Sequence, residues 1–173
     1  MARLPIFVAP DPHLKVTAKA VTEVDDTLKK LMDDMMETMH AANGIGLAAP
    51  QVGKAVRVLV MDISRTEEPP TPVCMANPEI VWASDILELN EEGCLSLPDQ
   101  FADVKRPSAV RVSYLDQNNT PQTLDADGLL ARCVQHEMDH LDGKLFVDHI
   151  SNLKRSMILR KLQKSRRGEP ETV

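Results

Sequence analysis

The chain has 173 residues, of which 43% are hydrophobic and 27% are charged, a balance typical of a globular protein with a substantial core. Its length predicts a single domain spanning residues 1–173. No apolar run approaches the roughly 20 residues of a membrane span, and the proline-broken start does not match a secretory signal peptide. The three cysteines are odd in number and lack the spacing of a disulfide framework, so we expect a cytoplasmic protein.

The net charge of −6 is unevenly distributed along the chain. Residues 151–167 contain seven bases and no acid, whereas residues 1–150 contain 24 acids and 13 bases. A basic helix at 151–167 is either a solvated surface or a contact for a polyanion such as RNA, and the sequence leaves both open. The last six residues, 168–173, are expected to form a disordered tail.

Helical patterns occur near both ends of the chain. Residues 25–42 place leucines and methionines on one face, with Asp25 as the expected N-cap and Gly44 near the end. Helical spacing returns in DADGLLARCVQHEMDHLDG (125–143), and a final helix is expected over 151–166 with Ser151 as its N-cap.

Strand patterns fill the middle of the sequence. AVRVLVMDI (55–63) predicts a buried strand, and a polar, proline-rich loop follows it. Short strand candidates then follow: CMANPEIVW, DILEL, CLSLP, FADVKR and AVRVSYLD, with DQNNTP as a turn into QTLDA. Short, mainly antiparallel strands bracketed by helices indicate an α+β fold, packed around the central helix at 125–143.

The sequence QHEMDHLDG (135–143) places His136 and His140 four residues apart on this central helix. At 3.6 residues per turn the two side chains differ by about 40° in direction and roughly 6 Å in height, so both imidazoles can reach one ion. Glu137 projects about 100° further round, where it can accept a proton from water beside the ion. The spacing therefore predicts a metal site with an adjacent base.

Two imidazoles need a third ligand, and its identity distinguishes several classes of enzyme. A metzincin peptidase would have histidine at position 146, where this chain has Phe146. Other zinc peptidases use a downstream glutamate, but only Glu169 and Glu171 remain, in the polar tail. Upstream, EEGCLSLP (91–98) offers Cys94, whose thiolate is a strong ligand for zinc or ferrous iron.

Three motifs occur in a fixed order: GIGLAAPQVG (44–53), EEGCLSLP (91–98) and QHEMDHLDG (135–143). With them the chain resembles the bacterial peptide deformylases over most of residues 4–165. The resemblance implies a single catalytic domain that removes the N-formyl group from the initiating methionine of new polypeptides and releases formate.

The resemblance also implies roles for individual residues. Cys94, His136 and His140 would hold one divalent ion, ferrous iron in the cell, with zinc, nickel or cobalt as alternatives because this ligand set suits several metals. Glu137 would be the general base and acid. The Gln51 side chain and the Leu95 backbone N–H would stabilise the oxyanion. The substrate pocket would be lined by Ile45, Gly46, Leu129 and Cys133.

Three positions differ from a common form of the family. That form has branched aliphatic residues at two pocket positions and an arginine that meets the peptide backbone of the substrate. Asn90 and Arg132 replace the aliphatics, and Phe101 replaces the arginine, so substrate preference is not determined. The basic helix falls where some family members touch the ribosome, which makes ribosome contact a hypothesis. Formylated nascent polypeptides are the expected partners, and no membrane partner is expected.

Other interpretations remain open from the residues alone. A zinc endopeptidase, a thiol hydrolase with Cys94 as nucleophile, and a structural metal domain each account for part of the pattern. Gly44, Gly46 and Ala49 match a loose dinucleotide fingerprint, but they follow a helix and precede Pro50, so no nucleotide cofactor is expected.

The surroundings of the metal ligands are less determined. Histidine ligands usually donate their second ring N–H to an acceptor, which the sequence does not identify. Glu92 and Arg106 form either an ion pair near Cys94 or an ordinary surface pair.

Overall fold

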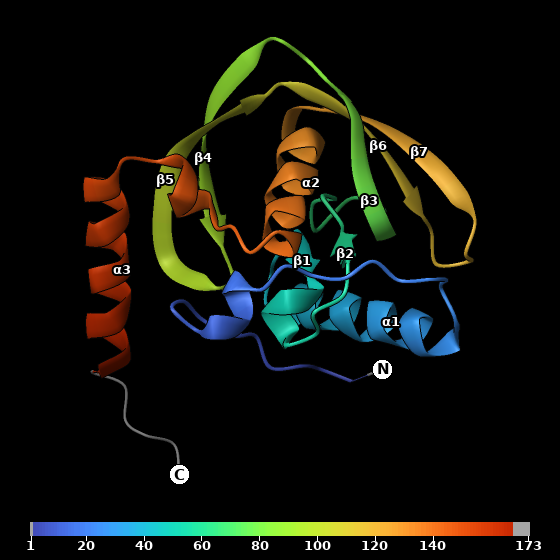
Figure 1. Cartoon of the computed structure of the whole chain (residues 1–173), viewed down its shortest axis with the longest axis horizontal. Coiled ribbons are helices and arrows are strands. Elements are labelled where there is room, and N and C mark those ends of the chain that lie inside the picture. The colour runs from blue at the N-terminus through green and yellow to red at the C-terminus, as the bar shows by residue number, and fades with distance from the viewer. Residues whose placement is uncertain (1, 168–173) are drawn as a thin grey trace.

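A computed structural model describes residues 2–167 of the chain (Figure 1). The central helix α2 (Gly128–Leu141) lies between a five-stranded sheet and a two-stranded ribbon. Helix α1 (Asp26–Ala41) lies below the sheet, and α3 (Asn152–Arg167) lies along the outer side of the ribbon. This arrangement confirms the expected α+β fold around a central helix. The expected tail at 168–173 lies outside the described residues.

The larger sheet is antiparallel throughout and has the strand order β1-β2-β3-β6-β7. Its strands are β1 (Gly46–Ala48), β2 (Val58–Met61), β3 (Val73–Ala83), β6 (Ala109–Leu115) and β7 (Pro121–Asp127). The buried strand expected at 55–63 is confirmed as β2, and all four of its residues are buried. The short β1 at the sheet edge carries the start of the first motif toward α2.

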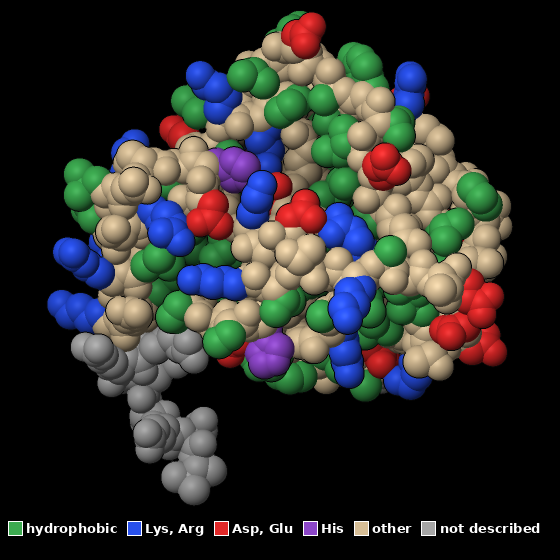
Figure 2. Space-filling view, in the orientation of Figure 1, with side chains coloured by type: hydrophobic (Ala, Val, Ile, Leu, Met, Phe, Trp, Pro, Cys, Tyr) green, Lys and Arg blue, Asp and Glu red, His purple; other side chains and the backbone are tan. Residues whose placement is uncertain are grey.

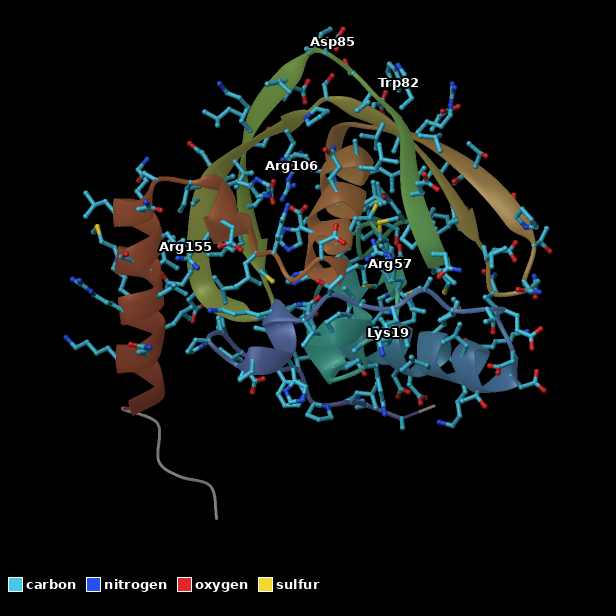
Figure 3. All side chains as sticks on the ribbon, viewed as in Figure 1. Lys19, Arg57, Trp82, Asp85, Arg106 and Arg155 are labelled. Carbon is cyan, nitrogen blue, oxygen red and sulfur yellow. The ribbon has the colours of Figure 1, made fainter. Side chains whose placement is uncertain are left out.

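The ribbon consists of β4 (Leu87–Cys94) and β5 (Leu97–Pro107). Here one strand prediction is wrong, because CLSLP does not form a strand of its own. Cys94 pairs with Leu97, so Leu95 and Ser96 form the two-residue turn of a hairpin. At the other end, Figure 3 places Trp82 and Asp85 where β3 leads into β4, far from α1.

The helix boundaries agree with the capping residues expected from the sequence. The Asp25 carboxylate accepts a hydrogen bond from the Leu28 N–H at 2.9 Å, and the Ser151 hydroxyl accepts one from the Lys154 N–H at 3.2 Å. Within residues 2–167, three short 3₁₀ helices connect the larger elements: η1 (Pro12–Lys15), η2 (Ala49–Val52) and η3 (Phe146–His149).

The apolar interior is divided into clusters on either side of α2. Val134 and Leu141 of α2 pack with Leu59 and Met61 of β2, on the face of the larger sheet opposite α1. The methionine face of α1 buries Met32, Met35 and Met39 in a second cluster.

Helix α3 closes the third cluster, in which Ile158 and Leu162 pack with Leu97 and Val104 of the ribbon. Figure 2 shows lysine and arginine side chains projecting from the outer side of this helix. Across the described residues, no helix is both long and apolar enough to cross a membrane.

Candidate metal centre and active site

The three predicted metal ligands meet at one point. His136 and His140 lie on the buried face of α2, with exposures of 9% and 1%, and Cys94 lies at the end of β4. The Cys94 Sγ atom is 3.4 Å from His140 Nε2. One ligand atom from each of the three residues lies within 4.8 Å of the others.

This geometry fits a tetrahedral divalent metal. With metal–sulfur and metal–nitrogen bonds of about 2.3 and about 2.0 Å, tetrahedral ligand atoms lie roughly 3.5 Å apart, close to the separation of Cys94 and His140. Burial lowers the pKa of His140 well below its usual range, and the positive charges of His136 and Arg106 add to this effect. The imidazole of His140 is therefore neutral, as a metal ligand must be.

His136 is oriented by Glu92, the acceptor that the sequence did not identify. Its Nδ1 lies 2.9 Å from Glu92 Oε1, so its Nε2 is left for the metal. Arg106 donates to both oxygens of the same carboxylate, at 2.7 and 2.9 Å, and the pair is almost fully buried. Of the two alternatives for Glu92 and Arg106, the structure therefore has the ion pair near Cys94.

The charge on Glu92 is maintained by its partners. Burial alone would raise the pKa of this carboxyl, but hydrogen bonds from His136 and Arg106 outweigh burial and lower it to about 2. Burial likewise lowers the pKa of His136, yet its contacts with Cys94 and Glu92 raise it well above its usual value. Cys94 and Glu92 thus favour a positive charge at His136, either on the imidazole itself or on a divalent cation for which the imidazole gives up its proton.

Glu137 lies beside the ligands and is 4% exposed. Burial raises the pKa of its carboxyl to about 7, although the positive charges of His136 and Arg106 oppose this. Its Oε2 has no hydrogen-bond partner among the described residues. A buried carboxyl with a pKa near neutrality and a free oxygen can both accept and release a proton.

Gln51 is held by η2 and the ribbon turn. Its Oε1 accepts from the Ala48 N–H at 2.9 Å, and its Nε2 donates to Ser96 Oγ at 3.0 Å. The same Nε2 lies 3.6 Å from Cys94 Sγ. The amide nitrogen is thus fixed next to the metal ligands, with Leu95 immediately after Cys94 in the turn.

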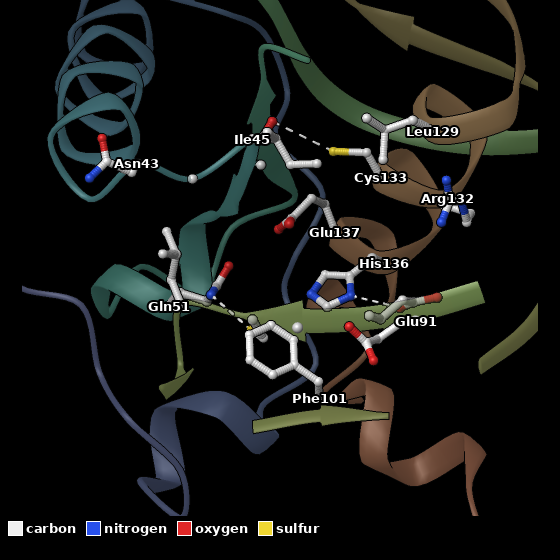
Figure 4. A pocket seen from close by; sticks show the side chains of 16 residues that line it. Asn43, Ile45, Gln51, Glu91, Phe101, Leu129, Arg132, Cys133, His136 and Glu137 are labelled. Carbon is white, nitrogen blue, oxygen red and sulfur yellow. Dashed lines mark hydrogen bonds and ion pairs between the residues drawn. The ribbon is translucent and has the colours of Figure 1, made fainter. Parts of the chain in front are cut away.

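These groups line a pocket of about 310 Å³ (Figure 4). Every candidate site residue except His140 contributes to its wall, and His140 is buried behind them. Ile45 and Leu129 are 40% and 42% exposed in the opening. The Cys133 Sγ lies 3.6 Å from the Ile45 carbonyl oxygen, and burial together with Glu137 raises the pKa of this thiol well above its usual range.

Some lining residues were not identified from the sequence. They include Asn43, which precedes the first motif, and Glu91 and Gly93, which belong to the second. The only sequence feature that could have identified them as pocket residues is their position inside or next to the motifs. Of the three residues that depart from the common family form, Phe101 and Arg132 line the pocket, whereas Asn90 is not among its lining residues.

A pocket with a Cys-His-His ligand set beside a buried glutamate defines a metal-dependent hydrolase. The model of the polypeptide deformylase family matches residues 3–156. The chain is 50% identical to the peptide deformylase of Brucella suis over 164 residues, covering 95% of this chain and 94% of that protein. It is 54% identical to that of Pelagibacter ubique over 159 residues, covering 92% of each. The chain therefore belongs to the polypeptide deformylase family, whose members remove N-formyl groups from nascent polypeptides.

Solved structures agree with this assignment. The crystal structure of peptide deformylase from Ehrlichia chaffeensis has a TM-score of 0.92 and 41% sequence identity, covering 96% of this chain and 98% of that one. The same enzyme in complex with actinonin also has a TM-score of 0.92, at 43% identity. The residues alone left three other classes open: a zinc endopeptidase, a thiol hydrolase and a structural metal domain. Because the chain belongs to the polypeptide deformylase family, it is none of these.

Proposed function

We propose that Cys94, His136 and His140 hold one divalent ion and that this ion is ferrous iron in the cell. The supporting observation is the convergence of one thiol and two imidazoles beside Glu137 in an open pocket. One thiolate and two neutral imidazoles leave a divalent site with a formal charge of +1. Zinc, nickel and cobalt suit the same ligands.

The proposed chemistry uses Glu137 twice. A bound divalent ion supplies Lewis acidity, lowering the pKa of a water molecule and drawing electron density from the formyl oxygen. The Glu137 carboxylate takes the proton of the attacking water, and its elevated pKa allows it to hold that proton at neutral pH. It then donates the proton to the amine that leaves, and formate departs.

Two further donors act on the oxyanion in this proposal. The Gln51 amide nitrogen is fixed by contacts at both ends of its side chain, and the Leu95 N–H follows Cys94 directly. Donors fixed in advance stabilise developing charge without rearrangement, and the loss of one typically costs a factor of ~10² to 10³ in rate.

The apolar part of the pocket is proposed to receive the methionine side chain of the substrate. Ile45, Leu129 and Cys133 supply its wall, and Gly46 leaves room between them and Glu137. We also propose that residues 1–173 act as a single catalytic domain in the cytoplasm, where formylated chains are made.

The test of this function is formate release from formyl-Met-Ala-Ser by iron-loaded protein. Glu137→Gln should retain the metal but reduce turnover by at least about a hundredfold, because proton transfer is lost. Glu79→Gln, an exposed change on β3 outside the pocket, is the matched control and should leave turnover intact. Unchanged turnover in Glu137→Gln would refute the proposed role of Glu137.

A second proposal concerns α3, whose basic residues would contact the ribosome. Lys154, Lys161 and Lys164 are exposed on a helix that is anchored by Ile158 and Leu162. Changing these lysines to glutamate should abolish co-sedimentation with ribosomes while leaving the buried side of the helix intact. The control changes three exposed lysines elsewhere to glutamate, at positions 15, 29 and 54. Equal loss in both variants would mean that only net charge matters.

A further inference from the structure

A network of charged side chains connects the metal centre to the molecular surface. It begins at His136, whose ring nitrogen is bonded to Glu92, and continues through the buried pair of Glu92 and Arg106. Arg106 Nη1 donates to Asp139 Oδ2 at 2.9 Å. The same oxygen lies 2.7 Å from Nε2 of His149. Figure 3 shows Arg106 between the ribbon and α2.

This network of side chains runs from the interior to the solvent. The side chain of Arg106 is 5% exposed, that of Asp139 is 20% exposed, and that of His149 is 34% exposed. His149 belongs to η3, the segment that precedes α3, and so lies outside both elements that supply the metal ligands. Its ring nitrogen contacts Asp139, the residue that precedes His140 on α2.

The orientation of each group in this series depends on the next group toward the surface. With donors on two sides, the Oδ2 oxygen of Asp139 is fixed in position, whereas an oxygen held by Arg106 alone can move and take the arginine nitrogen with it. Rotation of Arg106 would disturb its two bonds to Glu92, and Glu92 sets the direction of the His136 ring. Groups that orient a metal-binding histidine from outside commonly change metal affinity by 10–100-fold, about the effect of a weakened ligand.

We propose that His149 is a positioning residue for the metal centre, acting on His136 through Asp139, Arg106 and Glu92. The inference rests on the proposed assignment of His136 as a metal ligand. It differs from a merely structural role, in which His149 would tie η3 to α2 without affecting the ligand.

The test compares His149→Ala with His149→Gln. Alanine removes the contact to Asp139, whereas glutamine retains an N–H donor. We expect a chelator to strip zinc from the His149→Ala protein about tenfold faster than from the unaltered protein, with most of the difference restored in His149→Gln. In metal-free protein, the NMR signal of the His136 Nδ1 proton should shift or broaden in the alanine variant alone.

Arg155→Ala is the matched control. It removes the 2.9 Å ion pair to Asp148 of the same η3 segment and leaves the network from His149 to His136 intact. Zinc loss at the normal rate from His149→Ala, or equally fast loss from Arg155→Ala, would overturn the proposal. Thermal melting of each variant checks that it is folded. Metal content of Cys94→Ser tests the ligand set separately, and the His136 proton signal decides the positioning role even if that set fails.

Discussion

At the scale of single residues, the site depends on a missing side chain as much as on those present. A Cβ atom at Gly46 would lie 2.6 Å from Glu137 Oε1 and 2.9 Å from Cys133 Sγ, both closer than contact distance. The resemblance to the family placed Gly46 in the pocket wall. The structure adds the physical reason, which is that β1 passes directly over the proposed general base.

Gly46→Ala should therefore displace the Glu137 carboxylate. A shift near 1 Å in a catalytic group can lower the rate by about a hundredfold, and we expect a loss of that order in kcat/KM with metal content unchanged. Gly44→Ala is the comparison, because the three atoms nearest to its Cβ all belong to the flexible Leu95 side chain, which can move. Full activity in Gly46→Ala would show that Glu137 does not need its present position.

At the scale of elements, the loop between β2 and β3 is organised by one carboxylate. Asp62 is 5% exposed and accepts hydrogen bonds from the backbone and hydroxyl of Ser64, at 3.0 and 2.6 Å, and from the Thr71 N–H at 3.2 Å. His40 contacts its other oxygen at 3.1 Å. Burial alone would raise the pKa of Asp62, but these hydrogen bonds lower it from 3.8 to about 2.

The lowered pKa makes this loop sensitive to acid. Because the unfolded chain takes up the proton first, the stabilisation is complete above the unfolded pKa of 3.8 and is lost as pH falls toward about 2. We expect Asp62→Asn to remove about 2 kcal/mol of pH-dependent unfolding free energy, measured by urea denaturation across this window. Parallel acid curves for the two proteins would contradict the assignment.

Most helices and several strands could be predicted because local patterns determine them. The capping side chains of Asp25 and Ser151 and the continuous apolar run of β2 are short-range features of the sequence. The division of the strands into a sheet and a ribbon is not, since it depends on pairing between distant segments. The CLSLP segment was wrongly predicted as a strand because its apolar residues span a hairpin turn, with Leu95 in the turn itself.

The same distinction applies to the candidate site. His136 and His140 were predictable from their spacing on one helix, and Cys94 from the need for a third ligand. Contacts between elements, such as Glu92 with His136 or Gly46 with Glu137, have no local signature. They appear only when β1, β4 and α2 are brought together.

At the scale of the whole molecule, the proposed ion would join two parts of the fold. Cys94 comes from the β4–β5 ribbon and the two histidines come from α2. Metal removal should therefore lower the melting temperature and increase hydrogen exchange in the ribbon more than in the five-stranded sheet. A ligand present at a thousand times its dissociation constant stabilises the folded state by about 4 kcal/mol. A uniform change in exchange over both sheets would argue against a link at this position.

The pocket is built from three separated stretches of chain, around positions 43–51, 91–101 and 129–137, with the last ligand at His140. No shorter stretch starting at the N-terminus contains the full set. While a copy is being synthesised, it thus has no working centre until His140 has emerged and the early segments have closed around it. On the proposed ligand set, we therefore expect activity to arise only late in synthesis, once the third ligand has been added.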